Sequence, residues 1–242
     1  SVVMDSGAVK VISPFRGSPA EKAGVKAGDF ITHLDGELIY GGDLDDAVSR
    51  MRGQEGTSIK LTIFRPGRDE PLELSVTRGV IELEPVTYKL EHGNIGVITV
   101  NEFSTNVGRD VHQAWKAMQT EAAGRINGLV LDMRSNPGGS LDEAIALSDL
   151  FLDRGTIVSQ RGRYARDTEV YPAEIDTKGD IAKGTPMIVL IDEGSASASE
   201  IFAGAMQDYH RALILGGQTF GKGTVQSVQP LNHGELKLTL AK

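Results

Sequence analysis

The sequence predicts an α/β domain preceded by a small β-rich module. Residues 1–80 are short stretches of alternating apolar and polar residues separated by glycine turns, a pattern typical of β-strands. From residue 93 onward, apolar strand-like runs alternate with helix-like segments, which favours parallel strands buried between helices. The 242 residues, 40% of them hydrophobic, can form two ordinary domains with proper cores. We interpret residues 81–92 as the connector between them.

The first module is expected to hold four main strands and two short helices. The strands are predicted at residues 8–13, 30–34, 59–64 and 72–77, and the helices at 19–23 and 44–52. Leu44, Val48 and Met51 share one face of the second helix by their i, i+4, i+7 spacing. This face is either part of the core or the wall of a binding groove.

The second half reads as strands and helices in alternation. We predict strands at 95–100, 128–133, 187–191 and 212–215, and helices at 108–122, 141–152 and 197–209. In parallel sheets functional sites gather at the carboxyl ends of strands, so the segments after Met133 and Asp192 are candidates. Residues 153–185 are polar and irregular, and we expect them to cross the surface beside the cleft.

Composition excludes several functional classes. The net charge is −8 and no basic run interrupts the acidic background, which argues against a nucleic-acid or anionic-membrane surface. Cysteine is absent, so disulfides and zinc–thiolate sites are excluded, and we expect no cofactor or metal. No apolar run is long enough to span a membrane, and a chain that opens on Ser1 is interpreted as a trimmed fragment.

A run of small residues, Gly194-Ser-Ala-Ser-Ala-Ser-Glu-Ile201, lies between a predicted strand and a predicted helix. The segment from Ser197 to Glu200 fits a helix capping box, a purely structural role. The same helix start offers unpaired N–H groups and a positive dipole end, which can stabilise an oxyanion. Ser195 and Ser199 are equally available as the exposed hydroxyl at this stage.

Lys222 lies between two glycines in Phe220-Gly-Lys-Gly-Thr-Val-Gln226. A lysine kept neutral by burial can take a proton from serine without histidine, so serine and lysine can form a hydrolytic pair. Two alternatives compete: an ordinary surface lysine, and a P-loop in residues 216–222. Gly223 stands where a P-loop needs Ser or Thr, and residues 224–230 alternate like a strand, so the nucleotide-binding reading is disfavoured. His210 is about 20 Å along the helix from Ser197, too far to act as its base.

The stretch Gly17-Ser-Pro-Ala-Glu-Lys-Ala-Gly-Val-Lys-Ala-Gly-Asp-Phe-Ile31, followed by Leu34-Asp-Gly36, resembles the PDZ domain. The resemblance implies that an extended peptide C-terminus adds as a strand beside the second helix, with Leu44, Val48 and Met51 lining the groove. The family's carboxylate-binding loop is expected to precede Ser1, so the PDZ domain, residues 1–80, is interpreted as N-terminally incomplete.

Three separated segments resemble the carboxyl-terminal processing proteases, the S41 family of serine peptidases. They are Leu131-Asp-Met-Arg-Ser-Asn-Pro-Gly-Gly139, Ser195-Ala-Ser-Ala-Ser-Glu-Ile201 and Phe220-Gly-Lys-Gly-Thr-Val-Gln226. The resemblance implies a crotonase-like β-β-α peptidase core over residues 93–242, truncated at its C-terminus. It implies Ser197 as nucleophile, Lys222 as base and Gln226 as the residue that orients the lysine. The oxyanion donors it implies are the N–H of Ala198 and of Gly139, or else Gly138.

The same resemblance implies a substrate class and a setting. The substrates are proteins with unstructured C-terminal tails, which the PDZ domain recognises while it gates activity. Regulatory or adaptor proteins and a homo-oligomer are further implied possibilities. The expected location is the periplasm or another extracytoplasmic space of the cell envelope. The alternative is a catalytically latent, PDZ-bearing regulatory protein, although serine, lysine and glutamine are all retained.

Overall fold

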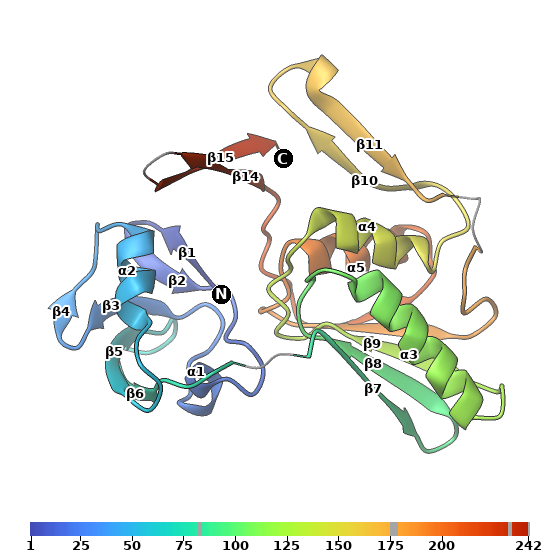
Figure 1. Ribbon diagram of the computed structural model, residues 1–242, viewed down its shortest axis with the longest axis horizontal. Helices are drawn as coiled ribbons and strands as arrows, with labels where there is room; N and C mark the ends of the chain where they lie inside the picture. The colour runs from blue at the N-terminus through green and yellow to red at the C-terminus, as the bar shows by residue number, and fades with distance from the viewer. Residues whose placement is uncertain (82–83, 175–178, 232–233, 242) are drawn as a thin grey trace.

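The computed structural model describes residues 1–81, 84–174, 179–231 and 234–241. Figure 1 shows a small β-rich body at the N-terminal end of the chain, drawn in blue, beside a larger α/β body. Each body has its own hydrophobic core: one cluster is centred on Val9, Ile31 and Ile63, and the other on residues such as Leu131 and Phe202. The two-part organisation predicted from the sequence is therefore present.

The N-terminal body is an antiparallel sheet with two short helices. Its elements are β1 (Val2–Asp5), β2 (Ala8–Val11), α1 (Pro19–Lys22), β3 (Phe30–Leu34), β4 (Glu37–Leu38), α2 (Leu44–Met51), β5 (Ser58–Phe64) and β6 (Leu72–Thr77). The strands lie in the order β1-β2-β3-β5-β6, with β4 paired to β3. Helix α1 begins where the sequence supplies an N-cap at Ser18 and a proline at the next position, and Asp43 caps α2 in the same way.

The larger body is built on a sheet in the order β13-β12-β9-β8-β7. Its elements are β7 (Val86–Glu91), β8 (Ile95–Val100), α3 (Val107–Glu121), β9 (Gly128–Asp132), α4 (Leu141–Asp149), β12 (Met187–Ile191), α5 (Ala198–Asp208) and β13 (Leu213–Gly216). Strands β8, β9, β12 and β13 run parallel, as predicted. Alternate side chains of β8 and four of the five of β9 are buried, and Trp115 of α3 packs in the core.

One segment contradicts the predicted connector. Residues 86–91 form β7, which pairs antiparallel with β8 along its whole length, from Val86↔Val100 to Glu91↔Ile95. The strand was missed because an edge strand is half solvated, and its charged residues hide the alternation that marks a buried strand. The chain segment that connects the two bodies therefore ends at Val86, where β7 begins.

Two hairpins stand out from the α/β body. The first is β10 (Thr156–Arg161) and β11 (Thr168–Pro172), joined through the short helix η1 (Ala165–Asp167). It corrects the expectation that residues 153–185 are irregular. The second is β14 (Val225–Leu231) and β15 (Gly234–Ala241). Figure 1 shows the first hairpin rising beyond α4 and the second leaning towards the N-terminal body.

No helix among the described residues has the length and apolar character needed to cross a membrane.

Candidate active site

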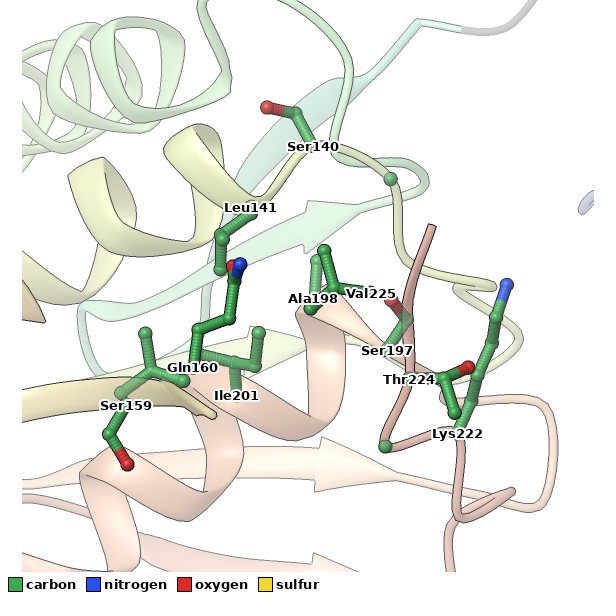
Figure 2. Close-up of a pocket in the computed structure, with 13 residues that line it drawn as sticks. Ser140, Leu141, Ser159, Gln160, Ser197, Ala198, Ile201, Lys222, Thr224 and Val225 are labelled. Atoms are coloured by element: carbon green, nitrogen blue, oxygen red, sulfur yellow. The ribbon is translucent and has the colours of Figure 1, made fainter. Parts of the chain in front are cut away.

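A cavity of about 510 Å³ opens where the loops at the carboxyl ends of β9 and β12 meet. Its walls come from four parts of the chain: Gly139 to Leu141, Val158 to Gln160 of β10, the start of α5, and Lys222 to Val225 before and at the start of β14. Figure 2 shows Ser159 and Gln160 on one side, Ser197, Thr224 and Lys222 on the other, and Ala198 and Ile201 between them. Segments that are far apart in sequence thus meet at one site, the edge of the sheet where a site was expected.

Ser197 is the serine of its run that faces this cavity. Ser195 and Ser199 are fully buried, and their hydroxyls donate to the Met133 carbonyl at 2.8 Å and the Asn136 carbonyl at 3.0 Å. Ser197 is half-buried and lines the cavity. The sequence left three serine hydroxyls as candidates. Those of Ser195 and Ser199 hold the loop by their hydrogen bonds, and Ser197 is the one that lines the cavity.

The backbone of Ser197 adopts φ 54° and ψ −112°, a sparsely populated conformation for a residue with a Cβ. Its N–H donates to Glu200 Oε2 at 2.7 Å, as the capping-box pattern predicts. Its carbonyl accepts from the N–H groups of Glu200 and Ile201 at 2.9 and 3.0 Å. These bonds fix the sharp turn from β12 into α5, with Ser197 at its apex.

Two backbone N–H groups are available beside Ser197. Within the described part of the chain, neither Ala198 N–H nor Gly139 N–H has a hydrogen-bond acceptor, and both residues line the cavity. Gly138 N–H, in contrast, donates to Asn136 Oδ1 at 2.9 Å. The N–H groups of Ala198 and Gly139 could therefore donate to an oxyanion, whereas Gly138 N–H is already bonded to Asn136.

The two glycines are required by close approach as well as by conformation. Gly138 has φ +95°, and a Cβ there would lie 2.8 Å from Ser197 Cβ and 2.9 Å from Ala198 N. Gly139 has φ +145°, and a Cβ there would lie 2.3 Å from the Phe103 carbonyl oxygen. A side chain at Gly138 would push the loop away from the serine turn, and a side chain at Gly139 would push it away from Phe103.

The loop that carries Lys222 is fastened to the serine turn by Glu200. Gly221 N–H donates to Glu200 Oε1 at 2.7 Å, and Lys222 N–H donates to Glu200 Oε2 at 2.9 Å. One carboxylate thus accepts from the backbone of Ser197, Gly221 and Lys222 together. Figure 2 shows the side chain of Lys222 running beside Ser197 with its amine pointing away from the serine hydroxyl.

Gln226 is the second residue of β14, where its backbone pairs with Thr239. Its side chain lies outside the described part of the structure, so its predicted contact with Lys222 stays a prediction. Strand β14 begins at Val225, and the residues from 217 to 224 have no regular secondary structure. The segment after Lys222 is a strand and not a helix, which contradicts a P-loop.

Sequence reasoning missed the residues that hold the loops together. Asp192, directly after β12, accepts from Ser135 N–H at 2.7 Å, Gly194 N–H at 3.0 Å and the Ser135 hydroxyl at 3.2 Å. Asn136 is fully buried and donates to the Val100 carbonyl at 2.8 Å. Their signal in the sequence is weak: Asp192 directly follows β12 and Asn136 lies in the loop after β9, which marks a site but not the partners of these residues.

The N-terminal body touches this scaffold directly. Arg16 lies within 3.5 Å of the buried carboxylate of Asp132 and donates to the Arg134 carbonyl at 2.9 Å. The Ser13 hydroxyl donates to the Ser135 carbonyl at 2.9 Å. Burial by itself would raise the pKa of Asp132, but hydrogen bonds from Arg134 and the charges of Arg16 and Arg134 lower that pKa below its ordinary value. The carboxylate is therefore held ionised at the contact between the two bodies.

Lys10 makes a second contact between the bodies. Its amine lies 5.0 Å from the ring centroid of Phe220 and 5.4 Å from that of Phe30. Phe220 is two residues before Lys222, and its N–H donates to the Ser195 carbonyl at 3.0 Å. The N-terminal body thus reaches the loop that carries the lysine.

A second cavity, of about 400 Å³, lies in the N-terminal body. Val48 and Met51 of α2 line it, together with residues such as Val2, Leu61 and Val76. Leu44 does not line it; it is half-buried against the core of this body. Two of the three predicted groove residues therefore face an apolar cavity.

The position of His210 contradicts the alternative in which this histidine is the base for Ser197. His210 follows α5, whereas Ser197 precedes that helix, so the two residues lie at its opposite ends. Their separation is the length of the helix, as expected.

Comparison with known proteins agrees with this geometry. Residues 94–242 match Peptidase family S41, and residues 11–65 match a PDZ domain. The chain is 47% identical to a carboxy-terminal-processing protease of Bartonella bacilliformis, over 99% of this chain and 55% of that protein. It is 40% identical to a "Probable CtpA-like serine protease" of Staphylococcus haemolyticus, over 94% of this chain and 44% of that protein.

A solved structure supports the same assignment. The photosystem II D1 C-terminal processing protease superimposes with a TM-score of 0.87 at 31% identity, covering all of this chain and 66% of that one. The chain spans about half the length of the curated relatives it matches. Since the S41 match covers more than half of the chain and includes the entire site, this chain belongs to peptidase family S41 and carries a PDZ domain.

Proposed function

We propose that the chain is the peptidase part of a serine endopeptidase that processes proteins near unstructured C-terminal tails. The observation that carries the proposal is the placement of Ser197. It is the hydroxyl of its run that faces the cavity, which is also lined by the loop of Lys222 and by two residues whose N–H groups have no acceptor among the described residues. The named relatives and the solved D1 processing protease support the same chemistry.

The proposed reaction is acyl transfer. Neutral Lys222 takes the proton of the Ser197 hydroxyl as the oxygen attacks the scissile carbonyl carbon, and the carbonyl oxygen becomes an oxyanion. Ala198 N–H and Gly139 N–H donate to that oxyanion. The lysine then gives its proton to the leaving amine as the C–N bond breaks. Water, losing a proton to Lys222, releases the acyl group and restores the serine.

The lysine must turn towards Ser197 for this reaction. Figure 2 shows the amine directed away from the serine hydroxyl, an arrangement that also fits a second candidate function: a latent, PDZ-bearing regulatory protein. In the active form we propose that Gln226 orients the lysine amine. The non-strand segment before Val225 leaves the chain free to fold back and bring the two side chains together.

We propose that the PDZ domain recognises the tail and gates this step. The 400 Å³ cavity offers an apolar pocket for a terminal side chain, lined by Val48 and Met51. Phe15 lines the same cavity, and the next residue, Arg16, contacts Asp132 and the Arg134 carbonyl. A tail in the cavity can therefore act on the peptidase loops only if it binds better when they are in the active arrangement.

We also propose where in the cell the protein acts, on the basis of its resemblance to bacterial processing proteases. An extracytoplasmic location in the cell envelope fits bacterial processing proteases of this kind, and adaptor proteins and self-association remain predictions.

The proposal is tested by Ser197→Ala with Ser199→Ala as the matched control. We expect Ser197→Ala to abolish both cleavage of an unstructured peptide and labelling by a fluorophosphonate, with little change in thermal stability, because its hydroxyl is replaced at an already capped helix start. Ser199→Ala should lose stability through its buried hydrogen bond but keep the labelled serine. A wild type that is never labelled, with or without a tail peptide, would support the latent regulator.

Gating of the peptidase by the PDZ domain is tested by a separate measurement, the rate at which Ser197 is labelled. Single-turnover labelling of Ser197 should be faster with a C-terminal tail peptide, and the acceleration should be lost in Val48→Lys, which places a charge in the apolar pocket. Equal acceleration in Val48→Lys and wild type would contradict tail recognition in this cavity.

A further inference from the structure

Strand β10 has one edge that is not paired. The described residues pair β10 only with β11, in a two-stranded sheet. The register runs from Val158↔Tyr171 through Ser159↔Val170 and Gln160↔Glu169 to Arg161↔Thr168. The opposite edge of β10 therefore presents its main chain without a partner strand.

The hydrogen-bond pattern shows which residues point to that edge. Gly162 N–H donates to the Asp167 carbonyl at 3.0 Å, so Gly162 directs its N–H towards the partner strand of the hairpin. In an antiparallel ladder bonded and non-bonded pairs alternate, so Gln160 and Val158 also bond to β11. Ser159 and Arg161 therefore direct their N–H and C=O groups away from β11. Outside the β10–β11 ladder, the main chain of Ser159 makes no backbone hydrogen bond to the described residues.

The open edge faces the catalytic cavity at Ser159. Three consecutive residues, Val158 to Gln160, line the cavity. A strand that presented one face would contribute every second residue, because side chains alternate. A consecutive run indicates that the edge itself forms the wall. Figure 2 places this wall opposite Ser197 and the loop of Lys222.

We propose that the substrate binds as an added β-strand on the open edge of β10, with one of its residues paired to both the N–H and the C=O of Ser159. The proposal rests on the peptidase function above and specifies how that site holds its substrate. The ligand class is an extended polypeptide without regular structure, since a helix or a paired strand has no free main-chain groups to offer. The paired substrate residue cannot be proline, because proline has no N–H.

The cavity adds a preference for the side chains of the added strand. Leu141, Val158, Ile201 and Val225 give it apolar walls. Main-chain pairing supplies affinity for any extended segment, and the apolar walls select an apolar side chain close to the scissile bond. Binding of an unfolded segment in this way explains structurally why folded regions would escape cleavage.

The test is Ser159→Pro, with Arg161→Pro as the matched control. Both prolines remove an N–H that the β10–β11 ladder does not use, and proline is tolerated at such edge positions. Ser159 lines the cavity and Arg161 does not. We expect Ser159→Pro to lower kcat/KM for an unstructured peptide about 5- to 100-fold, the range for losing one buried main-chain hydrogen bond. Arg161→Pro should stay within about 2-fold of wild type, as expected for a surface substitution.

Labelling by a small fluorophosphonate separates this inference from the function itself. The probe reaches Ser197 without spanning β10, so Ser159→Pro should be labelled at the wild-type rate. Equal labelling with unchanged peptide turnover in Ser159→Pro overturns strand addition and leaves the peptidase function standing. Absence of labelling in the wild type counts against the function. Equal losses in Ser159→Pro and Arg161→Pro also overturn strand addition, since the effect would then belong to the hairpin.

A substrate-side measurement covers the case in which Ser159→Pro does not fold. Wild-type protein is given a series of peptides, each N-methylated at one position within three residues of the scissile bond. Strand addition predicts that the residue paired with Ser159 does not tolerate the methyl group, whereas its two neighbours, whose N–H groups point away, do. Uniform tolerance across the series overturns the proposal.

Discussion

The carboxylate of Glu200 offers the sharpest test of how the site is assembled. It accepts from Ser197 N–H at 2.7 Å and Lys222 N–H at 2.9 Å through Oε2, and from Gly221 N–H at 2.7 Å through Oε1. Glu200→Gln keeps the shape but turns one acceptor oxygen into an NH₂ group. In the better amide orientation one hydrogen bond is lost and two donors face each other. In the other orientation two bonds are lost.

The expected decrease in acylation rate is worked out from the smaller of these losses, one hydrogen bond. A hydrogen bond to a charged group contributes about 1.5–3 kcal/mol. If that energy holds the lysine loop in place against Ser197, its loss slows acylation by about 10- to 150-fold, at about 1.4 kcal/mol for each factor of ten. Glu200→Ala removes all three bonds and should be slower still.

The assay is the rate of fluorophosphonate labelling and the turnover of an unstructured peptide, measured beside thermal unfolding. Glu193→Gln is the matched control, because this exposed carboxylate lies on the same loop, makes no hydrogen bond among the described residues and carries the same charge. A Glu200→Gln protein that acylates at the wild-type rate while folding normally would refute the bridging role. So would an equal loss in Glu193→Gln, which would point to charge and not to geometry.

Three further outcomes are expected. The acylation rate should rise with pH, because the neutral Lys222 amine is the base and only its deprotonated fraction can accept the serine proton; a rate that does not change between about pH 6 and about pH 9 would contradict this. Gly139→Ala should lower the unfolding temperature and abolish labelling, since its Cβ would lie 2.3 Å from a carbonyl oxygen, whereas Gly217→Ala, which has open space around it, should label like wild type. The stability that the lowered pKa of Asp132 contributes is present above its unfolded value of ~3.9 and is lost as pH falls through the folded pKa, so urea midpoints should drop in acid less steeply for Asp132→Asn.

Local patterns predicted most of the regular structure. The parallel strands β8, β9 and β12 are continuous apolar runs, and helices α1 and α2 carry their caps in the sequence, so each could be located without tertiary information. Strand β7 and the β10–β11 hairpin could not be located in this way. Both are largely solvated, and their stability comes from pairing with a neighbour and not from a buried face of their own.

By itself the sequence determined the chemistry that is available: a serine run before a helix, a lysine between glycines, a glycine pair after a buried strand, and a PDZ-like module upstream. Tertiary structure decided which of these groups meet. It buried Ser195 and Ser199 and left Ser197 in the cavity, occupied Gly138 N–H with Asn136 and left Gly139 N–H without an acceptor, and joined the serine turn to the lysine loop through Glu200. The physical reason is that hydrogen-bond satisfaction and close packing act between loops that only the sheet brings together, over distances in sequence that no local pattern records.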